Sequence, residues 1–460
     1  MCLKRVVILS QTYTTTVINM KKSRLWVDHG KMRRIRAEDL EWSLVLVPSL
    51  TQLCLDHIVQ HFEDNPILEE LPPKHKASVL LKLPTTLPLT TTANLICDED
   101  YWKRCCLKRW RLCDVSEYGN SWKRMFFECH LENIIEHYVP DVTDNNSVLE
   151  LVPLCRDFVK RLRISQLLPP VKEPEVFEEN DSVDSVSNPE EASLDHFDFR
   201  ILLDKLTNLN ELQLVYGVKN CGMNFEWPLF QFTLRDCQSL AEAVKSCKSL
   251  KVLRINRSLM DDQKCRLLVN HLLDHPSLLE LDLSHNIIGD GGARAISKLL
   301  NHSRLEVLNI YDNRISGPGA QALAHALSKN TSLVSFNLRL NQLGDEGGQA
   351  IAQALLKNQT LVNLHLGANE MTEPTASAFS QVLVCNMALK NLNLSCNKMG
   401  MDGGNVLEEG MSHNSTLLEF DIRLTEMSLE SERCIREVLC TNQDKVQRED
   451  TRDKPNRPAN

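Results

Sequence analysis

The chain has 460 residues, enough for two or three domains. Its 61 acidic residues outnumber its 52 lysines and arginines, which argues against nucleic-acid binding through a generally basic surface. No stretch is apolar for long enough to span a membrane, and the scattered cysteines lack the C-x-x-C spacing of a zinc site, so we expect free thiols in a reducing compartment.

The first part of the chain has no internal repeat. Residues 1–36 are basic without a clear core pattern, so we expect a mobile N-terminus. Residues 37–170 place apolar side chains at helical spacing, which predicts a small, mainly helical domain. Residues 171–196 are acidic and poor in large apolar side chains, and such a segment buries too little surface to order itself. We therefore expect a flexible linker there.

From Leu250 onward the chain repeats itself about every 28 residues. The pattern is L-x-x-L-x-L-x-x-N, as in Leu278, Leu281, Leu283 and Asn286. It returns in the units that begin at Leu305, Leu333, Leu361 and Leu389. This is the signature of the leucine-rich repeat. Units of this length stack into a horseshoe that has a parallel sheet inside and helices outside.

The predicted fold class is therefore α/β, a leucine-rich-repeat solenoid preceded by the small helical domain. Residues 249–443 are expected to form seven strand–helix units. Residues 197–248 are expected to form a capping repeat with an inserted loop, and residues 444–460 a polar tail. The first and last full units have Ser258 and Thr425 in place of the asparagine, as is typical of terminal repeats.

Polar residues mark the turns of each unit. The repeat asparagine is expected to satisfy backbone groups that its turn leaves unpaired. Aspartates near the starts of the helices are expected to act as helix N-caps, and these are Asp290, Asp345 and Asp402. Asparagines near the helix ends are expected to be left-handed caps, and these are Asn301, Asn330, Asn358 and Asn414.

The chain shows no sequence motif of a common enzyme class, so we predict that it is not an enzyme. The chain lacks the phosphate-binding G-x-x-x-x-G-K-[ST] motif, H-E-x-x-H and G-x-S-x-G. Its histidines are dispersed, which favours packing or partner contacts over metal binding. We therefore predict no catalytic, cofactor-binding or metal-binding residues, and no cofactor.

The residues between the inward leucines form the best candidate site, because open solenoid faces commonly bind proteins. This concave stripe is polar and mixed in sign, and its candidate partner-binding residues are Arg254, Asp282, His285, Tyr311, Arg339, His365 and Arg423. The alternative is that they only keep the sheet soluble. Phe225 and Trp227 of the inserted loop are a second candidate surface, although Trp227 could instead plug the open end of the core.

Segments outside the repeats carry a more specific resemblance. They are Ala93–Ile96, Tyr101–Cys106, Ser121–Glu128 and Cys221–Trp227. Together with ribonuclease-inhibitor-like repeats, they resemble the t-complex-associated testis-expressed protein family, which is that of dynein regulatory complex subunit 5. The similarity runs from about Arg33 to about Asn442, whereas residues 1–32 depart from the family.

The resemblance implies a non-catalytic scaffold subunit of the nexin–dynein regulatory complex, located in the cytoplasm and cytoskeleton, in the axoneme of the cilium or flagellum. It implies a role in sperm motility through contacts with other subunits of that complex, including a leucine-rich, F-box-like one, and indirectly with doublet microtubules. No nucleic acid or membrane is expected as a partner.

Two alternatives remain open. A loose F-box likeness around Leu71–Pro73, Val79–Pro84 and Trp102 suggests a substrate adaptor of a ubiquitin ligase. The other is a GTPase-activating protein of the same repeat class, although no distinctive arginine loop supports it.

Overall fold

The computed structural model describes residues 32–35, 45–170, 196–224 and 227–452. The chain divides into two compact units, Met1–Cys113 and Asp114–Asn460. The division falls inside the segment 37–170 that the sequence suggested as one helical domain, so residues 114–170 belong to the unit of the repeats. The suggested mobile N-terminus and acidic linker lie largely outside the described residues, whereas residues 444–452 of the suggested polar tail form the end of helix α16 (Leu429–Arg452).

The first unit contains a short antiparallel strand pair and four helices among its described residues. These elements are β1 (Met32–Ile35), β2 (Val45–Pro48), α2 (Leu50–Gln60), α3 (Pro73–Lys82), α4 (Leu89–Leu95) and α5 (Glu99–Arg109). Helix α5 begins after Asp98, whose side chain accepts a hydrogen bond from the backbone N–H of Tyr101 at 2.7 Å. Trp102 is fully buried, and its indole N–H donates to the carbonyl of Ile96 at 2.9 Å.

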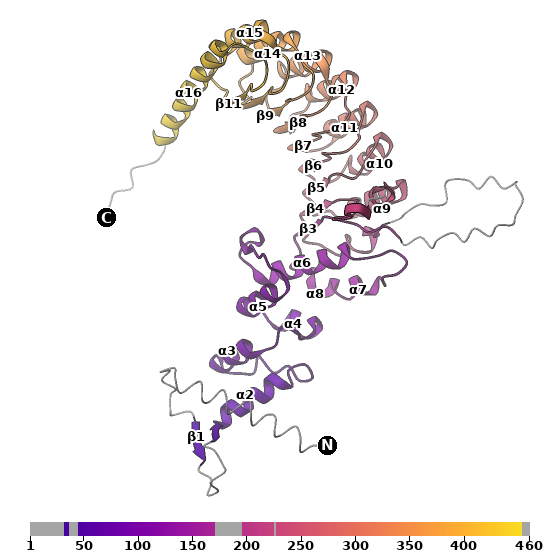
Figure 1. Ribbon diagram of the computed structural model, residues 1–460, viewed down its shortest axis with the longest axis vertical. Coiled ribbons are helices and arrows are strands. Elements are labelled where there is room, and N and C mark those ends of the chain that lie inside the picture. The colour runs from indigo at the N-terminus through magenta and orange to yellow at the C-terminus, as the bar shows by residue number, and fades with distance from the viewer. Residues whose placement is uncertain (1–31, 36–44, 171–195, 225–226, 453–460) are drawn as a thin grey trace, which may run out of the picture. The chain divides into compact units, whose positions relative to one another are not determined.

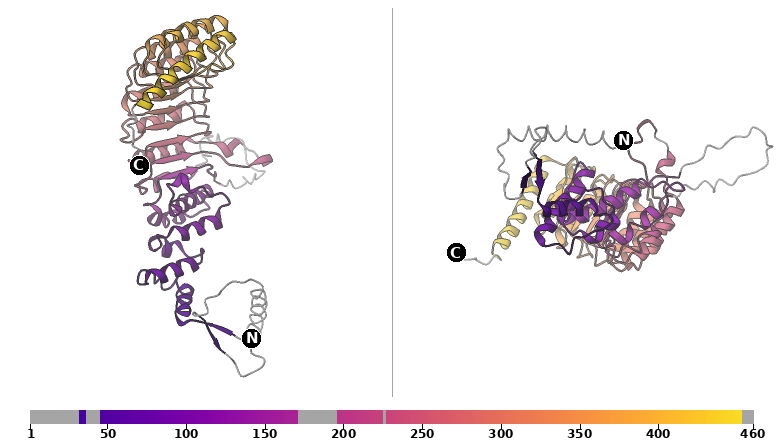
Figure 2. Two further views of the ribbon diagram at one scale, coloured as in Figure 1. Left: turned by 90° about the vertical axis from the view of Figure 1, so that its left-hand side faces the viewer. Right: turned by 90° about the horizontal axis from the view of Figure 1, so that it is seen from below.

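The second unit is built on a parallel sheet whose strands follow one another in chain order. Its described strands are β3 (Arg161–Ile164), β4 (Glu211–Leu214), β5 (Val252–Ile255), β6 (Glu280–Asp282), β7 (Val307–Asn309), β8 (Ser335–Asn337), β9 (Asn363–His365), β10 (Asn391–Asn393) and β11 (Glu419–Asp421). Each pairs with the next in parallel register; Phe336, Leu364 and Leu392, for example, lie side by side in the core. The left view of Figure 2 shows the strands stacked along the array.

Helices cover the outer side of this sheet (Figure 1). The repeat helices are α9 (Leu234–Ser246), α10 (Asp262–Leu272), α11 (Asp290–His302), α12 (Gly317–Leu327), α13 (Gly344–Leu355), α14 (Glu373–Cys385), α15 (Gly400–Ser412) and α16 (Leu429–Arg452). Units β5–α10 to β11–α16 are the seven expected repeats, so the predicted leucine-rich-repeat solenoid is confirmed.

Shorter elements precede these repeats. They are η1 (Val115–Tyr118), α6 (Trp122–Glu136), α7 (Asn146–Leu149), α8 (Val152–Cys155), η2 (Phe199–Ile201), η3 (Gly222–Asn224) and η4 (Trp227–Phe230). Strand β3 was not predicted, because it lies in a segment that otherwise has a helical pattern and is only four residues long. Its Leu162 and Ile164 are fully buried, and they extend the core of the array beyond β4.

The turn asparagines work as expected. The amide of Asn286 donates to the carbonyls of Ile255 at 2.8 Å and Leu283 at 3.0 Å, and its oxygen accepts from the backbone N–H groups of Ser258 and Met260. The residue before each of these asparagines is left-handed, for example Leu340 at φ 53° and Ala368 at φ 54°. Each turn therefore joins two neighbouring repeats through one buried amide.

The helix-end asparagines differ from expectation. None of Asn301, Asn330, Asn358 and Asn414 is left-handed. Asn301 is exposed within α11, whereas the other three are buried. They belong to a second ladder, made of Asn330, Asn358, Asn386, Asn414 and Asn442, whose amides donate to carbonyls of the preceding repeat. The distance from Asn386 Nδ2 to the carbonyl of Leu355, for example, is 2.7 Å.

The prediction that the helix-start aspartates cap the helices in which they stand is also wrong. Asp290 makes no cap to its own helix; its carboxylate accepts the backbone N–H groups of Ser316 at 2.9 Å and Gly319 at 3.0 Å, in the next repeat. Asp345 likewise accepts the N–H of Thr372 at 2.8 Å. Because a helix N-terminus has free donors, each such aspartate stabilises the following helix and ties two repeats together.

Candidate functional site

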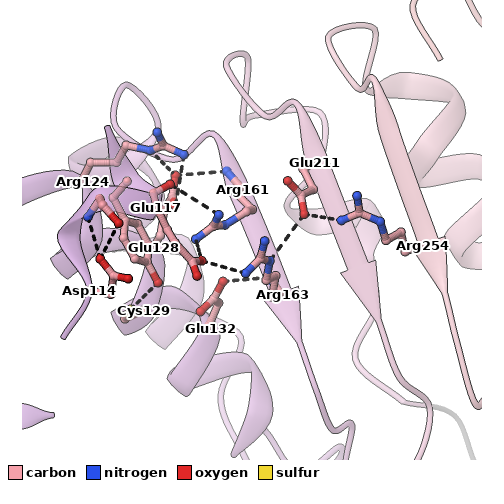
Figure 3. A network of polar contacts seen from close by, with 12 residues as sticks. Asp114, Glu117, Arg124, Glu128, Cys129, Glu132, Arg161, Arg163, Glu211 and Arg254 are labelled. Atoms are coloured by element: carbon pink, nitrogen blue, oxygen red, sulfur yellow. Dashed lines mark hydrogen bonds and ion pairs between the residues drawn. The ribbon is translucent and has the colours of Figure 1, made fainter. Parts of the chain in front are cut away.

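A helix, rather than another strand, covers the N-terminal edge of the sheet. Three glutamates spaced four residues apart on α6 face strand β3, and we call Glu128, Glu132 and Glu136 the glutamate row. Their carboxylates accept backbone N–H groups from alternate residues of the edge, which are Arg161 at 3.1 Å, Arg163 at 2.7 Å and Ser165 at 2.8 Å. Figure 3 shows the first two of these contacts.

The glutamate row therefore supplies the acceptors that a neighbouring strand would supply. Unpaired backbone donors at a sheet edge are a route to unwanted pairing, and this edge is closed. The glutamate row was not predicted from the sequence, although the four-residue spacing of its glutamates in a largely apolar helix was a signal for it. Glu128 is fully buried and also pairs with Arg124, at 2.7 Å between Nε and Oε1.

A chain of ion pairs continues from this edge onto the concave face (Figure 3). Arg163 pairs with Glu211 at 3.4 Å, and Glu211 pairs with Arg254 at 2.5 Å. Arg254 also pairs with Glu280 at 2.7 Å. Arg254 was predicted to be a partner contact, but its half-buried guanidinium is already held between two carboxylates on the neighbouring strands.

The middle of the stripe is a hydrogen-bonded polar surface. Asp282 accepts hydrogen bonds from the amides of Asn256 and Asn309, both at 2.9 Å. His285 lies 2.7 Å from a carboxylate oxygen of Asp312, and its ring meets that of Tyr311 edge-on with centroids 4.8 Å apart. The structure thus brings His285 and Tyr311 together.

The C-terminal part of the stripe offers more accessible charge. Arg339 is exposed and has no ion pair within the described part of the chain. The side chain of Arg423 is 83% exposed and pairs with Asp421 at 2.7 Å, which lowers the pKa of that carboxyl. Burial lowers the pKa of the half-buried His365, and the nearby positive charge of Arg339 adds to the shift. His365 is therefore uncharged at neutral pH.

The inserted-loop candidates are placed only in part. Phe225 lies outside the described residues, and Trp227 begins the short helix η4. The role of these two aromatic residues stays a prediction.

The described residues contain no cluster of three or more His, Cys, Asp or Glu side chains that could hold a metal ion. Among the helices of the described residues, none is both long and apolar enough to cross a membrane. The concave stripe presents hydrogen-bonding groups and charges, among them Asp282, Arg339 and Arg423.

Comparison with known proteins agrees with this architecture. The family model described as Leucine Rich repeat matches residues 274–297, 302–324 and 329–352. The chain is a leucine-rich-repeat protein.

The matches to individual proteins are more specific. Dynein regulatory complex subunit 5 of Mus musculus is 56% identical over 270 residues, which are 58% of this chain and 54% of that protein. The protein of that name from Macaca fascicularis is 54% identical over 307 residues, 66% of this chain and 61% of that one. The one from Chlamydomonas reinhardtii is 35% identical over 223 residues, 48% of this chain and 50% of that one.

The resemblance predicted from the sequence is thereby confirmed: the chain is a relative of dynein regulatory complex subunit 5. It spans between 50% and 61% of the length of these three curated relatives.

Proposed function

We propose that the chain is a non-catalytic scaffold subunit of the dynein regulatory complex. In this role it holds other subunits in place through protein–protein contacts and supports the beating of cilia and sperm flagella. It works in the axoneme, within the cytoskeleton of the cytoplasm. Its direct partners are other subunits of the complex, including a leucine-rich, F-box-like one, and it contacts doublet microtubules only indirectly.

The identity to the mouse and macaque proteins carries this proposal. A match of 270 or 307 residues is longer than the repeat array of residues 249–443, so it must include residues outside the repeats. Leucine-rich repeats alone are shared by proteins of many functions. Identity above 50% that extends past them favours a shared role in one complex.

The construction of the solenoid supports a mechanical role. Neighbouring repeats share sheet hydrogen bonds, two asparagine ladders and the aspartate caps, so force on one repeat passes directly to the next. Because each unit contacts only its neighbours, the strength of these joints sets the stiffness of the array. A linker that transmits force between doublets needs such stiffness.

The concave stripe is the proposed docking surface, with Arg339 and Arg423 as its most accessible charges. Arg254 is left out of this pair because its charge is neutralised within the fold. Exposed charges at the edge of an interface act mainly on association rate and specificity.

A charge-reversal experiment tests the docking surface. Cells that lack the endogenous protein are supplied with wild-type chain, with an Arg339→Glu/Arg423→Glu variant, or with a control. The control, Lys329→Glu/Lys357→Glu, makes the same change in charge at two exposed lysines that follow the outer helices α12 and α13. Axonemes are then extracted with increasing salt.

We expect the concave variant to leave the axoneme at lower salt than both wild type and control, and to restore beating poorly. If the folded concave variant is retained as firmly as wild type, the stripe is not the docking surface. Recovery of the wild-type chain with a cullin adaptor, and not with axonemes, would favour the ubiquitin-ligase alternative. The names of the three relatives give no support to that alternative.

A further inference from the structure

The two ends of the sheet are finished differently. At β3 the glutamate row accepts the outward N–H groups of the edge, as described above. At the other end, β11 pairs with β10 on one side and has no strand on its other side within the described residues. We propose that this open edge of β11 docks a strand of a partner protein, which runs parallel to β11 and extends the sheet.

Comparison with the internal repeats shows which backbone hydrogen bonds are missing at the edge of β11. In the repeat of β9, the backbone N–H groups of Leu366 and Ala368 donate to carbonyls of the following repeat, both at 2.8 Å. In the repeat of β10, those of Leu394 and Cys396 do the same at 2.8 and 2.9 Å.

Ile422 and Leu424 occupy the equivalent positions 28 residues later, which is one repeat further on. Their backbone N–H groups have no acceptor among the described residues. Two donors at this spacing match two carbonyl oxygens of one extended backbone, because alternate residues of a strand face the same neighbour. An extended segment therefore fits this edge better than a helix, whose carbonyls are already bonded.

The acceptors at the start of the same edge are already satisfied. In the preceding repeat, the carbonyl of Lys390 accepts the N–H groups of Leu418 and Glu419. The equivalent carbonyl of Leu418 instead accepts the side-chain amide of Gln443 at 2.8 Å, and that of Leu417 accepts the amide of Asn442 at 3.1 Å. Helix α16 thus closes the beginning of the edge and leaves its end open.

A groove lies beside these donors, where the inward side chains of a further strand would sit. Its volume is about 420 Å³, and strand β11 and helix α16 line it. Phe420 and Ile422 are 9% and 8% exposed, whereas the corresponding Leu392 and Leu394 are 2% and 0% exposed. The lining combines the apolar Ile435 and Leu439 with the charged Arg423, Glu432 and Arg436, so apolar side chains at alternate positions of the incoming strand can pack on the apolar part of the groove.

The occupant is thus an extended segment of another protein, with free backbone carbonyls and an alternating apolar pattern. Such pairing is a known mode of recognition, in which backbone bonds give affinity and side-chain pockets give specificity. The docking site does not depend on which complex holds the chain, so its test needs no axoneme.

The probe is a synthetic peptide with the sequence of residues 389–397, carrying Cys396→Ser to avoid oxidation. This sequence includes an internal strand of the array, and its Leu392 and Leu394 alternate along the strand. It is mixed at millimolar concentration with the full-length chain, and amide hydrogen exchange is followed by mass spectrometry with single-residue resolution. We expect exchange at Ile422 and Leu424 to slow by about tenfold or more, because both amides become bonded.

Two controls keep the result specific. A peptide that carries Leu392→Asp and Leu394→Asp should slow exchange much less, because burying its carboxylates against the apolar side chains of the groove costs free energy. In the protein, Leu439→Arg on α16 should block the groove and abolish the effect, whereas Thr441→Arg, on an exposed part of the same helix, should leave it intact.

Unchanged exchange at Ile422 and Leu424 would overturn the inference, and so would equal slowing by the two peptides. Protection of these amides without peptide, in a chain that sediments as a dimer, would also overturn it, because the occupant would then be a second copy of the chain. Each of these results leaves the proposed role in the axoneme untouched, and that role can fail without affecting them.

Discussion

Glu132 accepts the backbone N–H of Arg163 at 2.7 Å, so a carboxylate on helix α6 takes the place of a strand carbonyl at the edge of the sheet. Burial raises the pKa of Glu132 to about 8, although this hydrogen bond alone would lower it, and the neighbouring Glu128 adds to the increase. The protonated carboxyl can still accept through its carbonyl oxygen.

This gives the fold a pH dependence of definite sign. In the unfolded chain Glu132 ionises near its ordinary value of 4.5, whereas in the folded chain it keeps its proton to about pH 8. Stability from this group is therefore complete below about pH 4.5, declines as the unfolded chain ionises above that value, and is fully lost once the pH has risen through about 8. The Glu132→Gln variant, which keeps the oxygen but cannot ionise, should lose about 1 kcal/mol less stability than wild type between pH 7 and 9. Urea unfolding at both values checks this, with exposed Glu150→Gln as control. Parallel curves for wild type and Glu132→Gln would contradict it.

The helix-end ladder makes a prediction about stability. Asn386→Ala removes the donor to the carbonyls of Leu355 and Asn358, and the acceptor for the N–H groups of Ala388 and Leu389. Since these backbone groups are left unpaired in the core, we expect a loss of about 2–3 kcal/mol in the free energy of unfolding. Asn301→Ala, in an exposed position, should change it little. Thermal melts of the two variants compare them, and similar losses would show that the ladder is not stabilising.

The aspartate caps can be tested by a matched pair. Asp290→Ala should destabilise the chain by about 1–2 kcal/mol, because it uncaps helix α12 in the next repeat. Asp402→Ala should have little effect, because Asp402 is exposed and has no hydrogen-bond partner in the described part of the chain. Hydrogen exchange at Gly319 provides the local readout. Faster exchange in the first turn of α11 instead of α12 would mean that the cap acts within its own repeat.

Two arginines that look alike in the sequence, Arg254 and Arg339, have different surroundings in the structure. Arg254→Ala should lower stability by about 1 kcal/mol, because Glu280 loses its cation and Glu211 keeps only its 3.4 Å pair with Arg163. Arg339→Ala should leave stability unchanged. Denaturant titrations in low and high salt distinguish the two, since added salt should reduce the difference. Equal midpoints in low salt would show that the ion-pair chain adds nothing.

The repeat units could be predicted from the sequence because the inward leucines, such as Leu364 and Leu392, recur in a fixed phase. Which repeat each polar side chain contacts could not be predicted from the sequence. Asp290 stands at the start of one helix, and only the stacking of repeats brings it to the next. The same holds for Arg254, whose partners lie 43 and 26 residues away, and for the glutamate row, which meets strand β3 across about 30 residues. Contacts of this kind depend on tertiary placement, which no local pattern encodes.

The place of the chain in the dynein regulatory complex is tested most directly by quantitative mass spectrometry of the complex released from purified axonemes. We expect this chain to be present in constant proportion to the other subunits through successive purification steps, and to leave the axoneme with them. A chain that stays behind in the cytosol, or that separates from the complex at the first step, would show that it is not a subunit of the complex.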